Sequence, residues 1–178
     1  MLGSRPLTDQ EVKLVLANLT SARNRALFTL LLKTGYRISE GLSLKVSDCI
    51  QYDKIKDSIT VSRSNMKGKN RSRTVVLHDD AKKVLIEMGV LQMNPKDKLF
   101  PISRTQATRI FRKAVNKAKL GGKVTTHSAR KTFAKKIYHA LKKDLIGTQK
   151  ALGHVSMNST VSYLSFEQSE IDNAIKGI

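Results

Sequence analysis

Five side chains of this sequence could together hold and attack a phosphate group. His127 and Arg130 stand three residues apart, a spacing that places two side chains on one face of a helix. Guanidinium groups such as those of Arg37 and Arg130 form paired hydrogen bonds with phosphate oxygens and keep their charge. Imidazoles such as those of His127 and His154 transfer protons near neutral pH, and the hydroxyl of Tyr163 can act as a nucleophile. These residue types predict chemistry on a phosphodiester.

Each of these residues also has an ordinary structural explanation. Arg37 comes soon after a glycine, where an arginine can cap the carbonyls of a helix end. His154 fits a helix junction, and Tyr163 fits a half-buried aromatic of the core. A basic pair such as His127 and Arg130 is typical of a solvated helix face. Because arginines and lysines surround the two histidines, metal ligation fits poorly and no metal site is predicted.

The elements that would carry these residues are mostly helices. Thr8 and Glu11 form a capping-box pattern, which predicts an amphipathic helix immediately after Thr8. A strongly apolar helix from about Ser21 is expected to stop at Gly35. Ser39 resembles the cap of a short helix that follows. Further helices are predicted at 79–88, 103–119, 126–141, 144–152, 158–164 and 167–175.

Between about Ile55 and Leu77 the hydrophobic period changes from helical to alternating. Two strands, at 59–63 and 73–77, are predicted, joined by a basic hairpin at 65–70 that contains a glycine. The fold class expected is therefore mainly α with a small antiparallel β-sheet (α+β). At this length, one domain spanning 1–178 is predicted.

Charge narrows the classes of partner. Lysine and arginine number 33 against 14 aspartate and glutamate, which leaves a formal net charge of +19. The charges interleave with periodic apolar residues along the whole chain, so they indicate basic surfaces of folded helices and a polyanionic partner. No segment approaches the ~20 apolar residues of a transmembrane helix, so no membrane partner is expected. The lone Cys49 favours a reducing, intracellular (cytoplasmic or nucleoid) location.

In order and spacing, the motifs resemble the catalytic domain of the tyrosine recombinases, the phage integrase family. The first motif is the segment from Thr34 to Leu44, TGYRISEGLSL. The second is HSARKTFA from His127, followed by LGH ending at His154 and by TVSYL around Tyr163. The likeness spans residues 8 to 166, and it implies the tyrosine recombinase catalytic-domain, or DNA breaking-rejoining, fold.

The resemblance also implies an activity: site-specific recombination or integration through a covalent 3′-phosphotyrosyl intermediate on Tyr163. Arg37 and Arg130 would neutralise the phosphate, and their field would favour attack by the tyrosine as a phenolate-like group. The phosphoester energy stays in the intermediate, so neither a metal, ATP nor another cofactor is implied. A lysine of the strand-connecting hairpin would protonate the leaving 5′ oxygen. The hairpin offers Lys67 and Lys69, and the turn around Lys67 resembles the family more closely.

Three supporting roles come from the same resemblance. His127 would assist proton transfer at the tyrosine, and His154 would hydrogen-bond the scissile phosphate. Glu40 would orient His127 from behind, although a solvent-facing acid explains it equally well. Double-stranded DNA is the implied partner, and seven lysines are expected to face its backbone: Lys113, Lys117, Lys119, Lys123, Lys131, Lys135 and Lys136.

The resemblance also implies how the protein assembles on DNA and which domains accompany the catalytic one. Members of the family commonly form a tetrameric synapse on DNA, in which a C-terminal segment, here 165–178, docks on a neighbouring protomer. Most members also carry an N-terminal core-binding domain, which is absent from this sequence. Two explanations stay open: an excised catalytic domain whose residues 1–7 are a leader or cloning remnant, or a short inversion-type recombinase.

Two rival functions also stay open on the sequence. A regulator of the same fold would bind DNA without cleaving it, and a type IB topoisomerase would relax supercoils without exchanging strands between partners. The complete set of reactive residues argues against the first, and the LGH motif at His154 favours a recombinase over the second.

Overall fold

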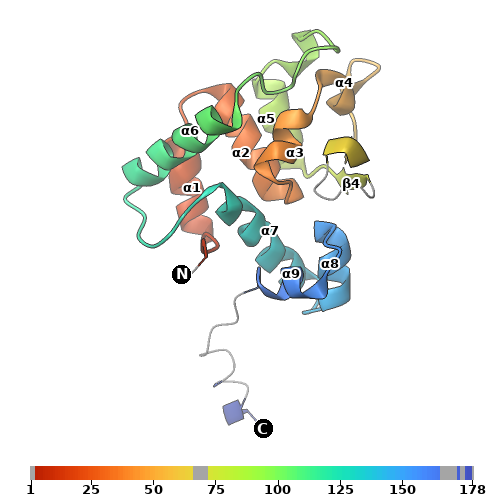
Figure 1. The fold of residues 1–178 in the computed structure, drawn as a ribbon. Helices are drawn as coiled ribbons and strands as arrows, with labels where there is room; N and C mark the ends of the chain where they lie inside the picture. Colours follow the sequence, from red (N-terminus) through yellow and green to blue (C-terminus); the bar gives the residue numbers. More distant parts are fainter. Residues whose placement is uncertain (1–2, 66–71, 165–171, 173–174, 178) are drawn as a thin grey trace. The chain divides into compact units, whose positions relative to one another are not determined.

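A computed structural model of the chain describes residues 3–65, 72–164, 172 and 175–177. The chain divides into two compact units, Met1–Phe133 and Ala134–Ile178. Helix α7 (Thr126–Ala140) begins in the first unit and ends in the second. The described secondary structure is mainly helical with two small antiparallel sheets, which confirms the predicted class (Figure 1).

Helix α2 (Ala22–Thr34) forms the centre of the first unit (Figure 1). Its residues 26–32 are all buried, because the stretch is apolar apart from Thr29 and so has no polar face. Helix α1 (Asp9–Ala17) precedes it and starts with the predicted capping box between Thr8 and Glu11. Gly35 ends α2 with a φ of 64°, and a β-carbon there would collide with the ring of Phe133. The predicted stop at Gly35 is therefore confirmed.

The short helix α3 (Ile38–Ser43) begins two residues earlier than the sequence predicts. The expected cap, Ser39, lies inside the helix, and Arg37 is the N-cap residue. The carboxylate of Glu40 reaches back to accept the backbone N–H of Arg37 at 2.8 Å. The carboxylate thus satisfies the backbone N–H at the start of the helix. The prediction that Ser39 caps this helix is therefore wrong.

Helix α4 (Val46–Cys49) leads into four short strands. Strands β3 (Ser58–Val61) and β4 (Arg73–Val76) pair antiparallel with Val61 opposite Arg73, close to the predicted positions. Between α4 and β3 the sequence analysis missed a hairpin of β1 (Ile50–Gln51) and β2 (Lys54–Ile55). Its turn residues, 52 and 53, both have positive φ but neither is glycine, so the usual sequence signal of such a turn is missing. The 3₁₀ helix η1 (Arg63–Asn65) follows β3.

Two helices cover α2. Helix α5 (Asp79–Glu87) packs along it, and the 3₁₀ helix η2 (Val90–Gln92) follows α5. Helix α6 (Arg104–Lys117) starts at a capping box of Ser103 and Gln106 and buries an apolar stripe. The rings of Phe28 and Phe111 stack with centroids 4.7 Å apart, which joins α6 to α2.

The segment before α1 fixes the loop that leads into α7. Arg5 makes an ion pair with Glu11 and donates to the carbonyl of Gly121 at 2.7 and 3.0 Å. The backbone N–H of Leu7 donates to the hydroxyl of Thr132 on α7 at 2.8 Å. These bonds restrain both sides of the start of α7, the helix that carries His127 and Arg130.

The second unit contains α8 (Leu145–Leu152) and α9 (Met157–Val161), which pack against each other. Helix α9 ends before Tyr163, which lies in the following turn and not in the helix that the sequence predicts. The helix predicted at 167–175 lies almost wholly outside the described residues. Across the described part of the chain, no helix combines the length and hydrophobicity needed to cross a bilayer.

Candidate active site

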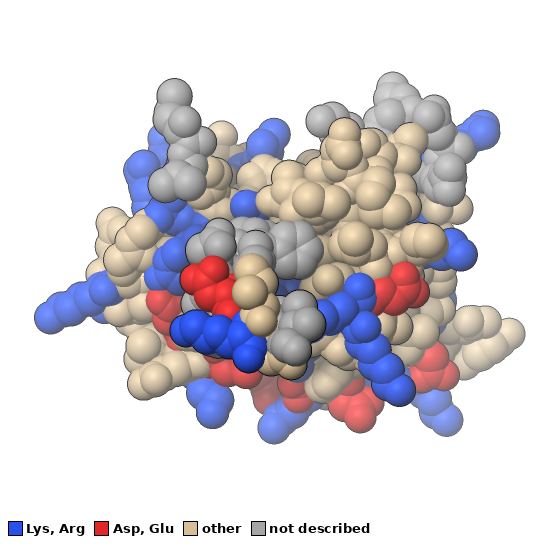
Figure 2. Space-filling model, turned by 90° about the horizontal axis from the view of Figure 1, so that it is seen from below, with Lys and Arg blue, Asp and Glu red and all other residues tan. Residues whose placement is uncertain are grey.

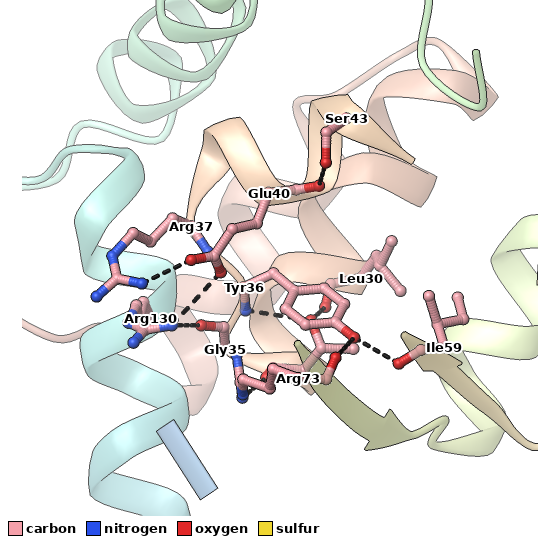
Figure 3. Close-up of polar contacts among 10 residues, drawn as sticks. Leu30, Gly35, Tyr36, Arg37, Glu40, Ser43, Ile59, Arg73 and Arg130 are labelled. Carbon is pink, nitrogen blue, oxygen red and sulfur yellow. Dashed lines mark hydrogen bonds and ion pairs between the residues drawn. The ribbon is translucent and has the colours of Figure 1, made fainter. Parts of the chain in front are cut away.

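Arg37 is held at the tight turn between α2 and α3. Gly35 reverses the chain in the left-handed conformation, and Tyr36 anchors the turn by donating its hydroxyl to the carbonyl of Ile59 at 2.6 Å (Figure 3). Burial raises the pKa of the Tyr36 hydroxyl, so it remains a donor at any physiological pH. The side chain of Arg37, 21% exposed, is therefore fixed at its base and accessible to an anion.

A buried carboxylate, Glu40, holds this arginine and faces a second one. One oxygen of Glu40 accepts the Arg37 Nη1 at 2.6 Å, and the other lies 3.8 Å from the Arg130 Nη1 (Figure 3). Among the described residues, its contacts run to the two arginines, whereas the sequence analysis expected it to orient His127. A buried carboxylate is stable only when it is paired, so Glu40 acts here as the counter-ion of Arg37 and Arg130.

Arg130 reaches the same turn from α7. Its side chain is 1% exposed, and its Nη1 donates to the carbonyl of Gly35 at 2.5 Å (Figure 3). Arg37 and Arg130, distant in the sequence, thus converge on one turn and one carboxylate. Two guanidinium groups that share one negative charge leave a net positive site, which is the electrostatic requirement for holding a phosphate.

A third arginine of this cluster was missed in the sequence analysis. Arg73, the first residue of β4, is 6% exposed and donates its Nη2 to the carbonyl of Thr34 at 2.6 Å. A sequence signal did exist: Arg73 shares its strand parity with the apolar Val75 and Leu77, and this alternation predicts an inward side chain.

His127 lies in the first turn of α7, one turn before Arg130. Burial, and then the positive charges of Arg104, Arg130 and Arg37, lower the pKa of its imidazole. The ring is therefore neutral at pH 7 and can accept a proton. Arg104, at the start of α6, was not singled out in the sequence; its positive charge is, after burial, the largest cause of the lowered pKa of His127.

The second unit brings His154 and Tyr163 together. His154 follows Gly153, which ends α8 with a φ of 65°, and its Nδ1 lies 3.0 Å from the hydroxyl of Thr160 on α9. The rings of His154 and Tyr163 meet edge to face with centroids 5.0 Å apart. The motif histidine and the candidate nucleophile thus form one small cluster, with the histidine oriented by Thr160.

The remaining predicted residues are less completely placed. Lys67 and Lys69 lie outside the described residues. Five of the seven lysines assigned to DNA backbone are exposed, whereas Lys131 and Lys135 are partly buried. Lys113 and Lys117 line a shallow hollow between α6 and the corner of α1 and α2. On the face in Figure 2, basic side chains lie dispersed among acidic ones and do not form a single patch.

No cluster of three or more histidine, cysteine, aspartate or glutamate side chains able to hold a metal occurs within the described parts of the chain. The described polar groups are of the types that another chemistry requires: cations for an anion, an imidazole as proton acceptor, and a hydroxyl as candidate nucleophile.

Comparison with known proteins shows the family of the chain. The sequence pattern of the phage integrase family matches residues 5–170. The tyrosine recombinase XerH of Campylobacter jejuni is 28% identical over 161 residues, which make up 84% of this chain and 43% of that protein. The chain spans about half the length of the curated relatives that it matches.

Solved structures show the same fold. The crystal structure of XerA recombinase matches with a TM-score of 0.77 at 27% identity, covering 97% of this chain and 63% of that one. XerH bound to a palindromic difH substrate, in a post-cleavage complex, matches with a TM-score of 0.76 at 26% identity, covering 98% of this chain and 53% of that one. The predicted tyrosine recombinase catalytic-domain fold is confirmed.

Proposed function

We propose, because this chain belongs to the phage integrase family, that it is the strand-cleaving and strand-joining part of a site-specific DNA recombinase. The observation that carries the proposal is the convergence of Arg37 and Arg130 on the turn at Gly35, with Glu40 between them. Such a pair suits one diester phosphate, since each guanidinium can face a nonbridging oxygen. XerH, a relative of this chain, has been captured after cleavage of its DNA substrate, which supports DNA as the substrate here.

The reaction begins when Tyr163 attacks the phosphorus of a phosphodiester held by the two arginines. A bond forms between the tyrosine oxygen and phosphorus, and the bond to the 5′ oxygen breaks. His127, neutral at pH 7, takes part in removing the tyrosine proton, and His154 donates from its Nε2 to a phosphate oxygen while Thr160 engages Nδ1. Arg37 and Arg130, as donors aimed at the developing charge, would each stabilise the transition state by ~3 to 4 kcal/mol.

The leaving 5′ oxygen needs a proton. Lys67 is the proposed donor, ahead of Lys69, on the family resemblance of the turn around it. The product is a 3′-phosphotyrosyl linkage that keeps the energy of the phosphodiester, so a 5′ hydroxyl of the same or another strand can reverse the step. The proposed cycle therefore uses neither a metal nor ATP.

An adduct assay tests the proposal directly. The protein is incubated with a pool of nicked duplexes, from which the short cleaved strand diffuses away, and the products are separated in SDS. We expect a covalent protein–DNA species whose modified peptide, identified by mass spectrometry, contains Tyr163. DNA binding without any adduct would instead favour a regulator that lacks the cleavage reaction. Relaxation of supercoiled plasmid without strand exchange would favour a topoisomerase.

Binding to DNA backbone should make the affinity depend steeply on salt. If about 6 to 10 phosphates are contacted, the association constant should fall by roughly a thousandfold or more between 50 and 200 mM salt. Fluorescence anisotropy with a labelled duplex measures this slope. A flat dependence would contradict backbone contacts by the proposed lysines.

The lowered pKa of His127 predicts how cleavage responds to acid. Its imidazole is already neutral at pH 7, so the rate should stay level above the ordinary histidine pKa of ~6.5 and fall at more acidic pH. Replacing Arg104 with glutamine removes a positive charge that lowers this pKa, so the fall should begin at higher pH. Single-turnover rates between pH 5 and 8 measure the midpoint.

The matched control is Arg109→Gln, which removes an equal charge from the same helix. Arg109 is not among the groups that lower the pKa of His127. The pH–rate profile of Arg109→Gln should therefore have the same midpoint as that of the wild type. A shift of equal size in both variants would show that net charge, and not the neighbourhood of His127, sets the profile.

Self-association on DNA is proposed through the segment 165–178. The second unit exposes apolar side chains next to α8 and α9, including Ile146 and Val155, which are 57% and 71% exposed. Apolar side chains of a neighbouring protomer's tail, such as Phe166 and Ile171, could cover them. A chain ending at Leu164 should therefore bind a single site but fail to form the larger DNA complex, as measured by analytical ultracentrifugation. Unchanged assembly would refute this role of the tail.

A further inference from the structure

Arg73 holds the turn that carries Arg37 by two separate contacts. Its Nη2 donates to the carbonyl of Thr34 at 2.6 Å. Its Cζ lies 5.0 Å from the centroid of the Tyr36 ring, and Figure 3 shows the two side chains together. Thr34 is the last residue of α2, so its carbonyl has no acceptor role within the helix. The guanidinium thus supplies the donor that the helix end requires, and stacks on the residue just before Arg37.

The next carbonyl of the same turn accepts Arg130. Arg73 from β4 binds the carbonyl of Thr34, and Arg130 from α7 binds the carbonyl of Gly35. The two arginines approach one turn from different elements, and both bonds fix the backbone from which Arg37 projects. Displacement of this turn would therefore move Arg37 and the acceptor of Arg130 together.

Arg73 also stands at the end of the segment that carries the candidate general acid. Strand β4 begins at Arg73, opposite Val61 of β3, and Lys67 and Lys69 belong to the connection between the two strands. The backbone carbonyl of Arg73 lies 3.4 Å from the hydroxyl of Tyr36, so its main chain and its side chain both contact the turn. The start of β4 and the turn at Gly35 are thereby coupled.

Stability alone does not explain an arginine at this position. A buried charge loses its hydration, and an apolar side chain of similar volume commonly preserves stability equally well. An apolar side chain would fill the space but could neither donate to Thr34 nor define the plane on which the Tyr36 ring rests. The arginine therefore fixes the position and orientation of the turn, which apolar packing alone would not do.

We infer that Arg73 is a positioning residue for phosphodiester cleavage, which sets the placement of Arg37 and Arg130 and links it to the strand following the hairpin lysine. This inference rests on the proposed function, since it assigns Arg73 to the same site. Arg73 acts through the turn and does not itself touch the phosphate.

The test compares two variants. Arg73→Met removes the donor and the charge but keeps the bulk, and Arg73→Lys keeps the charge but loses the planar group. Single-turnover cleavage is measured at saturating protein on a normal duplex and on one with a methylphosphonate at the scissile position. A methylphosphonate carries no charge, so its cleavage depends less on the arginine pair, whereas a damaged fold would impair both substrates equally.

We expect both variants to cleave the phosphodiester about 100-fold more slowly than the wild type, the effect typical of a ~1 Å misplacement. On the methylphosphonate the deficit should shrink to about tenfold or less, and DNA affinity should stay within about threefold, since the phosphate-binding groups remain present. The matched control is Arg25→Met. Arg25 also donates to turn carbonyls, those of Leu19 and Thr20, but at the opposite end of α2. It should cleave both substrates at the wild-type rate.

Three results would overturn the inference: full activity of Arg73→Lys, an equal deficit on both substrates, or wild-type rates for Arg73→Met. Failure of the wild-type protein to cleave either substrate would count against the proposed function instead. Crystal structures of the wild type and Arg73→Met then decide the inference independently. Displacement of the Gly35 carbonyl from Arg130, and of Arg37 from Glu40, supports it, and unchanged contacts refute it.

Discussion

Replacement of Tyr163 with phenylalanine is expected to abolish the covalent protein–DNA adduct, with a loss of at least about 10⁴-fold in cleavage rate. The phenylalanine keeps the ring that meets His154 edge to face, and it removes only the oxygen that would attack phosphorus. The fold and the phosphate-binding arginines are untouched by this change. DNA affinity should therefore stay within about threefold of the wild-type value.

The second unit provides a matched control for this experiment. Tyr138 on α7 also lies edge to face with a histidine ring, that of His139, at a centroid distance of 5.8 Å. Tyr138→Phe should form adducts at the wild-type rate. Adducts that persist in Tyr163→Phe and disappear in Tyr138→Phe would show that the nucleophile is Tyr138, and the proposed mechanism would have to be rebuilt around α7.

Arg130→Lys is expected to slow cleavage by roughly 100- to 1,000-fold, the range seen when one donor to developing charge is removed. A lysine keeps the positive charge but has a single nitrogen. In Arg130 the Nη1 alone donates to the carbonyl of Gly35 and faces Glu40, and the planar group has further nitrogens that can face a phosphate oxygen. The one nitrogen of a lysine would have to serve all three partners from a single position. Single-turnover cleavage at saturating protein measures the effect.

Folding must be followed in the same variant, because Arg130 is buried against Glu40. The free energy of unfolding, from urea titration, should fall by about 1 to 3 kcal/mol as the hydrogen bond to Gly35 is weakened. Arg112→Lys, a surface change on α6, is the matched control and should alter neither quantity. A cleavage rate within tenfold of the wild type, in a folded Arg130→Lys, would limit Arg130 to holding the turn.

Local signals in the sequence predicted the elements that frame the site. The capping box at Thr8 and the stop at Gly35 act through residues within one turn, so their meaning does not depend on the rest of the chain. The same reasoning failed for the hairpin turn at Tyr52 and Asp53. Neither residue is glycine, and their positive φ angles accompany the pairing of the flanking strands, which a search for turn residues does not detect.

The sequence by itself identified the candidate reactive groups, because their types and order carry the family pattern from Arg37 to Tyr163. Only the tertiary structure decided which other side chains neutralise and position these groups. Glu40 neutralises two arginines, and Arg73 joins the turn from β4, through contacts between residues far apart in the chain. Pairing of buried charges depends on distances in space, and a pattern of local spacing does not contain those distances.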